Sequence, residues 1–459
     1  MKANGVALPG NLAGAASVQT PMPATKTTYT LWASNAVNAS AQLGASVIVI
    51  SAASATQDTL PKAVYGAASV LLAAPANAAL VGKVLILGGF SDAAPYAAGA
   101  VPAGTALSSA YLFDPATNSL ALVGASVLTT PRVMPGAVLL TSGKVLVAGG
   151  NMTAASSLFE LVDTTLAVPT SAAIGGDTTS RCLAPLVGPM SNGRYLLTGG
   201  TDCTNDTAVN IWKTINPLSG APSVTSGGNG FSGTAPLALA RSWHTATKLT
   251  GDVVVLAGGR DALVGTNFME LVQYNPTVET STTFGLIGPS GGTGLTVARY
   301  GHTATRYPPN CTATNTCKVL FAGGAGTATA DVYTEPVGVI AFPGNIGALV
   351  AAGAMSAVRF THGAVRLDPT GAAPVASGLI LVAGGFDGAS PLATTELFDP
   401  GTNAFVAGPA LAMKRQEVSV LVGSAAANTA LIVGGTAATS GGVANATYPT
   451  LLEQVTLSP

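Results

Sequence analysis

Short runs of aliphatic residues that end in a Gly-Gly doublet recur along the chain. The seven doublets end at Gly89, Gly150, Gly200, Gly259, Gly324, Gly385 and Gly435. Six intervals separate residues 89 and 435, so the period is about 58 residues, the spacing of four-stranded units with long loops. Each run has the length and β-branched content of a buried strand. The pattern therefore predicts an all-β chain of repeated units.

Polar residues occupy fixed places around each doublet. A basic residue and a second apolar run lie upstream, at Lys62, Arg132, Arg181, Arg241, Arg299, Arg359 and Arg415. A third run lies downstream and carries an acid in five units, with Tyr111 in the first unit and Asn210 in the third. A weaker fourth run follows, as at residues 403–406. Four runs per unit predict a four-stranded sheet, one blade of a propeller.

This arrangement resembles the kelch repeat. One unit combines Arg359-Phe-Thr-His362, the doublet at Gly385, Glu396 and the Asp399-Pro400 turn. The resemblance covers residues 41–459 and departs from the family because most fourth runs lack the usual aromatic residue, which Phe405 retains. It implies an all-β, seven-bladed β-propeller of kelch-like four-stranded blades.

The two ends of the chain are expected to close the ring together. The seventh unit ends with its third run at residues 451–459, so its outer strand must come from elsewhere. The strand-like run within residues 42–50 is predicted to supply it, which would remove an open sheet edge. The chain then divides into an N-terminal arm, residues 1–40, and a propeller, residues 41–459.

The repeated cations have two interpretations. A ring of positive charges could attract an anionic ligand. The acid occurs only in units that have an arginine, however, which favours buried ion pairs, namely Arg132–Glu160, Arg241–Glu270, Arg299–Asp331, Arg359–Glu396 and Arg415–Glu453. Lys62 and Arg181 lack such an acid and are the candidates for ligand binding. The aspartates after doublets, Asp92, Asp202, Asp261 and Asp387, either form turns or contact a ligand.

Three histidines, His244, His302 and His362, each lie three residues after the arginine of successive units. The kelch-fold galactose oxidases bind copper through His and Tyr, but from differing loop positions. One repeated position on adjacent blades spreads its side chains around the ring, whereas a metal needs ligands about 2 Å from one point. We therefore expect core histidines, with no metal centre and no cofactor.

The four cysteines form two local pairs. Cys311 and Cys317 flank a predicted hairpin loop, and Cys182 and Cys203 flank the first two strands of one blade. Two disulfides within blades, Cys182–Cys203 and Cys311–Cys317, would indicate an oxidising compartment and an extracellular or cell-surface protein.

Composition excludes several partners. Charged residues make up 8% of the chain, against about 25% in ordinary soluble proteins, and the formal net charge is −1. Nucleic acid is not an expected partner, because phosphate binding needs a basic face. The two longest uncharged stretches are interrupted by Pro and Asn, so no transmembrane segment is predicted.

These observations favour an extracytoplasmic or cell-surface binding or scaffold protein that presents propeller loops to a protein or glycan. The arm of residues 1–40 could mediate self-assembly by strand addition. The alternative implied by the family is a carbohydrate-active kelch-fold enzyme, a sugar epimerase or oxidase. An intracellular substrate adaptor is a third possibility, against which the cysteine pairs argue.

Overall fold

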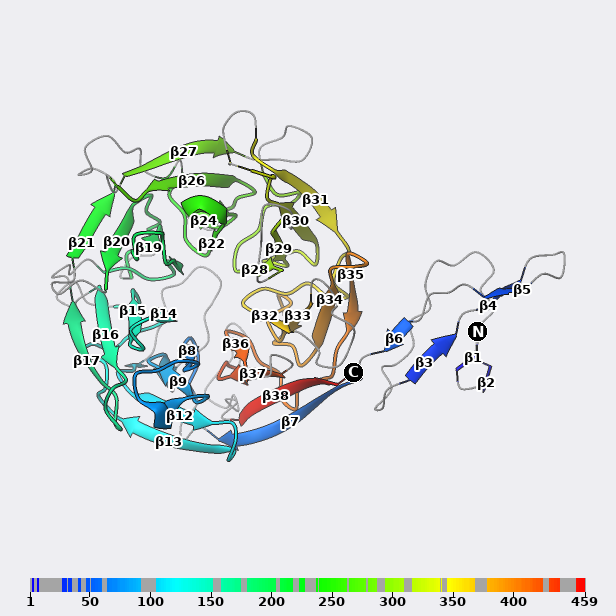
Figure 1. Cartoon of the computed structure of the whole chain (residues 1–459), viewed down its shortest axis with the longest axis horizontal. Helices are drawn as coiled ribbons and strands as arrows, with labels where there is room; N and C mark the ends of the chain where they lie inside the picture. The colour runs from blue at the N-terminus through cyan, green and yellow to red at the C-terminus, as the bar shows by residue number, and fades with distance from the viewer. Residues whose placement is uncertain are drawn as a thin grey trace.

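Seven antiparallel four-stranded sheets form a closed ring in the computed structural model (Figure 1). The predicted all-β, seven-bladed propeller is thereby confirmed. The structure describes the strands β1–β7 within residues 1–59 and, beyond them, residues 64–91, 105–151, 158–174, 180–203, 207–217, 223–227, 237, 239–261, 264–277, 280–286, 294–308, 316–338, 340, 345–367, 378–423, 429–437 and 451–458.

In blades 1 to 6 the strands run from the axis to the rim in chain order. Blade 1 contains β8 (Ala68–Leu71), β9 (Val84–Leu87), β12 (Ala110–Asp114) and β13 (Ser119–Gly124). Blade 2 contains β14 (Gly136–Leu139), β15 (Val145–Ala148), β16 (Phe159–Asp163) and β17 (Thr170–Ile174). Blade 3 contains β18 (Leu186–Val187), β19 (Tyr195–Thr198), β20 (Trp212–Asn216) and β21 (Ser223–Gly227).

The next three blades repeat this order. Blade 4 contains β22 (Thr245–Lys248), β23 (Val253–Ala257), β26 (Met269–Asn275) and β27 (Thr280–Leu286). Blade 5 contains β28 (Thr303–Tyr307), β29 (Lys318–Ala322), β30 (Ala330–Thr334) and β31 (Ala348–Ala352). Blade 6 contains β32 (Gly363–Leu367), β33 (Leu379–Ala383), β34 (Thr395–Asp399) and β35 (Ala404–Ala407).

Blade 7 is built from both ends of the chain. It contains β36 (Ser419–Val422), β37 (Thr429–Val433), β38 (Leu451–Ser458) and, outermost, β7 (Ser51–Thr59). In Figure 1, β7 lies along β38 and closes the ring. An N-terminal strand was predicted here, but its position at residues 42–50 was wrong. Most of that run's β-branched residues form β6 (Val47–Val49), which pairs with β3 (Thr27–Thr30) in a different sheet.

Small elements complete the described chain. The sheet of β3 and β6 also contains β1 (Lys2–Ala3) and β2 (Val6–Ala7), and β4 (Trp32–Ser34) pairs with β5 (Ser40–Gln42). Two hairpins add β10 (Phe90–Ser91) with β11 (Thr105–Ala106), and β24 (Arg260–Asp261) with β25 (Val264–Gly265). The helices in the described residues are the short η1 (Ala78–Leu80) and η2 (Thr250–Asp252), and neither is long or apolar enough to cross a membrane.

The core lies between the faces of adjacent blades. The second strands that precede the doublets are fully buried, as in β15 and β23. Their side chains meet those of the neighbouring blade, so that Tyr307 and Leu320 of blade 5 share a cluster with Ile380 and Phe398 of blade 6. Burial on both faces explains why these runs are continuously aliphatic rather than alternating.

The doublets allow close contact between blades. Gly258 has φ +58°, and a Cβ at this position would lie 2.4 Å from the carbonyl oxygen of Arg299, which belongs to the next repeat. Glycine is required because it combines a left-handed backbone with the absence of a side chain. The sequence signal that reveals the repeats is therefore a packing requirement between successive blades.

Candidate functional site

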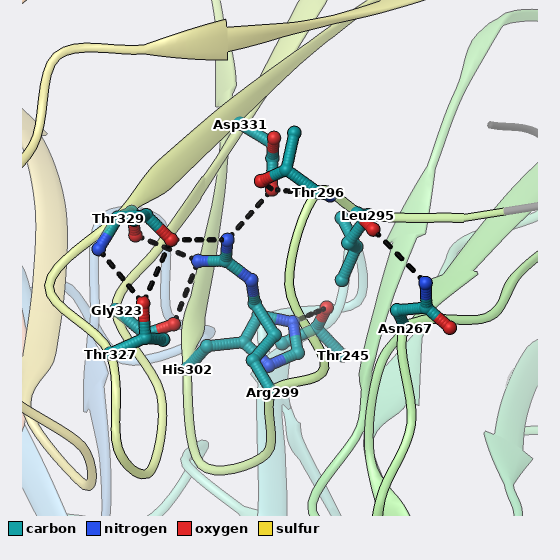
Figure 2. A network of polar contacts seen from close by, with 10 residues as sticks. All are labelled: Thr245, Asn267, Leu295, Thr296, Arg299, His302, Gly323, Thr327, Thr329 and Asp331. Carbon is teal, nitrogen blue, oxygen red and sulfur yellow. Dashed lines mark hydrogen bonds and ion pairs between the residues drawn. The ribbon is translucent and has the colours of Figure 1, made fainter. Parts of the chain in front are cut away.

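The repeat arginines are buried between strands rather than exposed to ligand. In blade 5, Arg299 Nη2 lies 2.7 Å from Asp331 Oδ2, and Nη1 donates to the carbonyl oxygens of Gly323 and Thr329, each at 2.8 Å (Figure 2). Arg299 precedes β28 by four residues. The arginines thus lie just before the innermost strands and not on them.

The same ion pair occurs in five blades, with the partners Arg132–Glu160, Arg241–Glu270, Arg299–Asp331, Arg359–Glu396 and Arg415–Glu453. Four of these acids, Glu160, Asp331, Glu396 and Glu453, also accept a hydrogen bond from a backbone N–H group. Glu160, for example, accepts from Thr129 N at 2.7 Å. Burial raises the pKa of the Glu160 carboxyl, but the Arg132 charge and these hydrogen bonds outweigh it, so the pKa is lowered. These groups stabilise the blades.

Blade 1 replaces this ion pair by apolar contact. Val64 O accepts from Gly435 N, as Arg132 O accepts from Gly89 N, so the repeat position in blade 1 is Val64. Val64 and Tyr111 belong to one hydrophobic cluster. The alignment that put Lys62 at this position was wrong, because it was displaced by two residues. Lys62 itself lies outside the described residues.

Blade 3 retains the arginine but not the acid. Arg181 is buried, and its Nη1 donates to Gly199 O at 3.3 Å. By strand register the residue at the acid's position is Lys213, opposite Leu197, and not Asn210 as predicted. A ligand-binding role for Arg181 stays a prediction.

The candidate aspartates occupy loops and hairpins. Asp387 Oδ1 accepts from the N–H groups of Ala389 and Ser390, which with its own backbone N–H lowers its pKa, as expected of a turn residue. Asp261 is exposed at the end of β24. Asp202 donates its N–H to Thr207 O after the third doublet. Asp92 lies outside the described residues.

The three histidines link successive blades. Their Nε2 atoms lie 3.0 Å from the hydroxyls of Thr198, Thr245 and Thr303, each in the preceding blade, for His244, His302 and His362 respectively. Figure 2 shows the His302–Thr245 contact beside Arg299. Burial and then the neighbouring arginine lower the pKa of His362 to about 3, so its ring is neutral. Among the described residues, no three His, Cys, Asp or Glu side chains form a metal-binding group.

One residue per blade turns toward the axis in a left-handed conformation. These seven residues, here called the axial ring, have φ between +47° and +63° and are Gly66, Met134, Leu183, Trp243, Gly301, Thr361 and Glu417. Backbone hydrogen bonds join several neighbours in the ring. Thr361 N donates to Gly301 O, and Glu417 N donates to Thr361 O, both at 2.8 Å. In most blades the ring residue follows the repeat arginine by two positions.

The axial ring lines a cavity of about 440 Å³. Its walls are mainly apolar, with Met134, Pro135, Leu183 and Trp243 among the lining residues. The three histidines also line it, and they are neutral. Among the described lining residues, Glu417 is the acid, and none is a lysine or an arginine. This cavity receives groups from all seven blades and is the candidate functional site.

Glu417 is the functional candidate that sequence reasoning missed. The residue is 7% exposed, and neither carboxylate oxygen has a hydrogen-bond partner among the described residues. Burial raises its pKa to about 8. A signal was present in the sequence, because the other six repeats have an uncharged residue at this position.

A disulfide joins the start of blade 3 to the segment after its doublet. Cys182 and Cys203 are bonded and buried, with their Cα atoms 5.1 Å apart. This predicted bridge is confirmed and indicates an oxidising compartment. Cys311 lies outside the described residues, so the Cys311–Cys317 bridge stays a prediction.

Comparisons with known proteins agree with this architecture. The kelch motif matches residues 371–411, which belong to blade 6. A fungal alcohol oxidase with catalytic diversity in the AA5 family, solved in complex with copper, aligns with a TM-score of 0.58 and 17% identity, over 89% of this chain and 76% of its own. No curated protein matches. The chain is a kelch-repeat β-propeller, as the resemblance implied, and its likeness to the oxidase is one of fold.

Proposed function

We propose that this kelch propeller is an extracytoplasmic binding and scaffold protein, which engages a protein or glycan partner and self-associates through its N-terminal segment. The observation that carries the proposal is the uncharged rim. Six of the seven outermost strands, all except β7 with Asp58, contain no charged residue and no proline. Exposed sheet edges in soluble proteins are normally protected by such residues.

Several of these outer strands also expose apolar side chains. Leu122 of β13, Val350 of β31 and Val406 of β35 are each about half exposed, at 53%, 52% and 46%. An exposed edge with apolar side chains is suited to pairing with a further strand. Blade 7 provides an intramolecular precedent, since the N-terminal strand β7 completes its sheet. The disulfide supports the extracytoplasmic setting, and kelch propellers commonly bind proteins.

Lysine substitutions on the rim test the proposal in the full chain. Leu122→Lys, Val350→Lys and Val406→Lys, separately and combined, are expected to reduce particle size in light scattering. Val264→Lys is the matched control, because Val264 is exposed in the β24–β25 hairpin and not on a rim strand. Equal particle sizes for the rim variants, the control and the unmodified chain would contradict self-association through the rim.

A carbohydrate-active enzyme is the second candidate, and the axial cavity with its buried carboxyl group favours it. A protonated glutamate can act as a general acid. Incubation with galactose and with acidic sugars, with and without added copper, tests this function. Turnover that is lost in Glu417→Gln would support the enzyme, whereas no conversion of either sugar class would leave the scaffold proposal favoured.

A further inference from the structure

The carboxyl group of Glu417 occupies a position that three separate effects disfavour. It is buried, its oxygens have no partner among the described residues, and its backbone has φ +56°. A non-glycine residue in the left-handed region is strained, and an unpartnered buried carboxyl group adds a desolvation penalty. Such strained groups gather at functional sites, where a ligand provides the missing contact. This geometry favours a positively charged ligand that can donate hydrogen bonds to the carboxylate.

We propose that the axial cavity binds a small organic ammonium ion, with the Glu417 carboxylate as its counter-ion and Trp243 and Met134 around its apolar part. Both residues line the same cavity as Glu417. An ammonium group supplies N–H donors to a carboxylate that has none, and charge-assisted bonds of this kind are strong. Tryptophan is the aromatic side chain that cations prefer.

The surrounding groups exclude an anionic ligand. Among the described residues, the ionisable side chains that line the cavity are His244, His302, His362 and Glu417. Burial keeps the histidines uncharged, so the described lining offers no positive charge to an anion. The described part of the chain also offers no cluster of ligands for a metal ion. A mainly apolar wall with one acid therefore matches an alkylammonium ion better than a hydrated metal.

Isobutylammonium and isobutanol are suitable probes, because they share a shape and differ in charge. Calorimetric titration of the full chain at pH 7 is expected to show binding of the ammonium ion and not of the alcohol. Because Glu417 is mostly protonated at this pH, binding is expected to release about 0.9 proton, seen as a dependence of the heat on the buffer. Affinity is expected to rise about tenfold from pH 6 to pH 7 for the same reason.

Two variants test whether Glu417 and Trp243 form the ammonium-binding site. Glu417→Gln is expected to weaken ammonium binding at least tenfold and to abolish the proton release. Trp243→Leu is expected to weaken binding several-fold while the proton release remains. Asp261→Asn is the control, since it makes the same chemical change at an exposed carboxylate outside the cavity lining.

Binding of an ammonium ion in the axial cavity does not depend on the scaffold function. Several results would contradict it. Absence of ammonium binding, equal binding of isobutanol, or unchanged binding by a folded Glu417→Gln chain would each overturn it. Binding of calcium in place of the ammonium ion would overturn the ligand class. The proton release is measured on the unmodified protein, so it tests the site even if a variant fails to fold.

Discussion

Arg132 and Glu160 form an ion pair in which both side chains are completely buried, with Nη2 2.6 Å from Oε1. The backbone of Arg132 binds blade 1, because its carbonyl oxygen accepts from Gly89 N, while its side chain binds the third strand of blade 2. The pair therefore connects two blades. In blade 1 the carbonyl oxygen of Val64 likewise accepts from Gly435 N, and an apolar cluster that contains Val64 and Tyr111 takes the place of the ion pair.

Blade 1 has Val64 and Tyr111 where blade 2 has Arg132 and Glu160, and this difference predicts how the ion pair contributes to the free energy of unfolding. Arg132→Val leaves the Glu160 charge buried and is expected to cost about 3–5 kcal/mol of unfolding free energy. Arg132→Val with Glu160→Tyr reproduces the blade 1 solution and is expected to recover at least about 2 kcal/mol, because no uncompensated charge remains. Urea unfolding measures both. Equal destabilisation by the single and double variants would show that Arg132 does not stabilise the protein by compensating the buried charge of Glu160.

The buried histidines predict acid sensitivity. Their folded pKa values lie below the unfolded value of about 6.5, so the unfolded chain binds more protons as the pH falls. Their stabilising contribution is complete above pH 6.5 and is lost toward the folded pKa, about 3 for His362, by up to about 1.4 kcal/mol per pH unit for each histidine. Unfolding at pH 6.5, 5.5 and 4.5 should show a smaller decline in His362→Gln. An unchanged decline in that variant would locate the acid sensitivity elsewhere.

Glu417 predicts the opposite dependence. Its folded pKa of about 8 exceeds its ordinary value of 4.5, so the folded chain holds a proton that the unfolded chain releases. Its contribution is complete below pH 4.5 and is lost as the pH rises to 8. Glu417→Gln is therefore expected to raise the melting temperature, and to raise it more at pH 8 than at pH 5. A gain that is equal at both pH values would mean that ionisation of Glu417 does not limit stability.

The Cys182–Cys203 disulfide predicts sensitivity to reduction. It joins residues 21 positions apart, and a closed loop of this length contributes about 3 kcal/mol by restricting the unfolded chain. Cys182→Ala with Cys203→Ala is expected to lose about this amount in urea unfolding. In that double variant, reductant should cause a smaller further loss than in the unmodified protein. Equal losses in both would place the effect of reduction outside this bridge.

The repeats made the ring predictable because each doublet is a packing requirement, as Gly258 shows against Arg299. The sequence does not align individual repeats correctly where the repeat arginine or its acid is replaced by another residue. In blade 1 the arginine is replaced by Val64, so the nearest cation, Lys62, was aligned instead. In blade 3 the acid's position is held by Lys213, which carries the opposite charge and gives no sign of equivalence.

The closing strand was misplaced for a different reason. β7 consists of Ser, Ala, Thr, Gln and Asp residues, and its backbone pairs with β38 along residues 51–59. A strand at the rim depends on backbone hydrogen bonds more than on apolar side chains, so the more hydrophobic run at residues 47–50 gave the stronger signal. Glu417 was missed because its importance depends on the convergence of seven separate turns at the axis.

The most direct measurement of the scaffold account is the particle size of the full chain and of a chain lacking residues 1–40, by light scattering and negative-stain imaging at matched concentration. Deletion of residues 1–40 leaves β7 in place to complete blade 7. If the chain self-associates through its N-terminal segment, the full chain forms extended or multimeric particles and the shortened chain forms single propellers. Single propellers in both samples would contradict it.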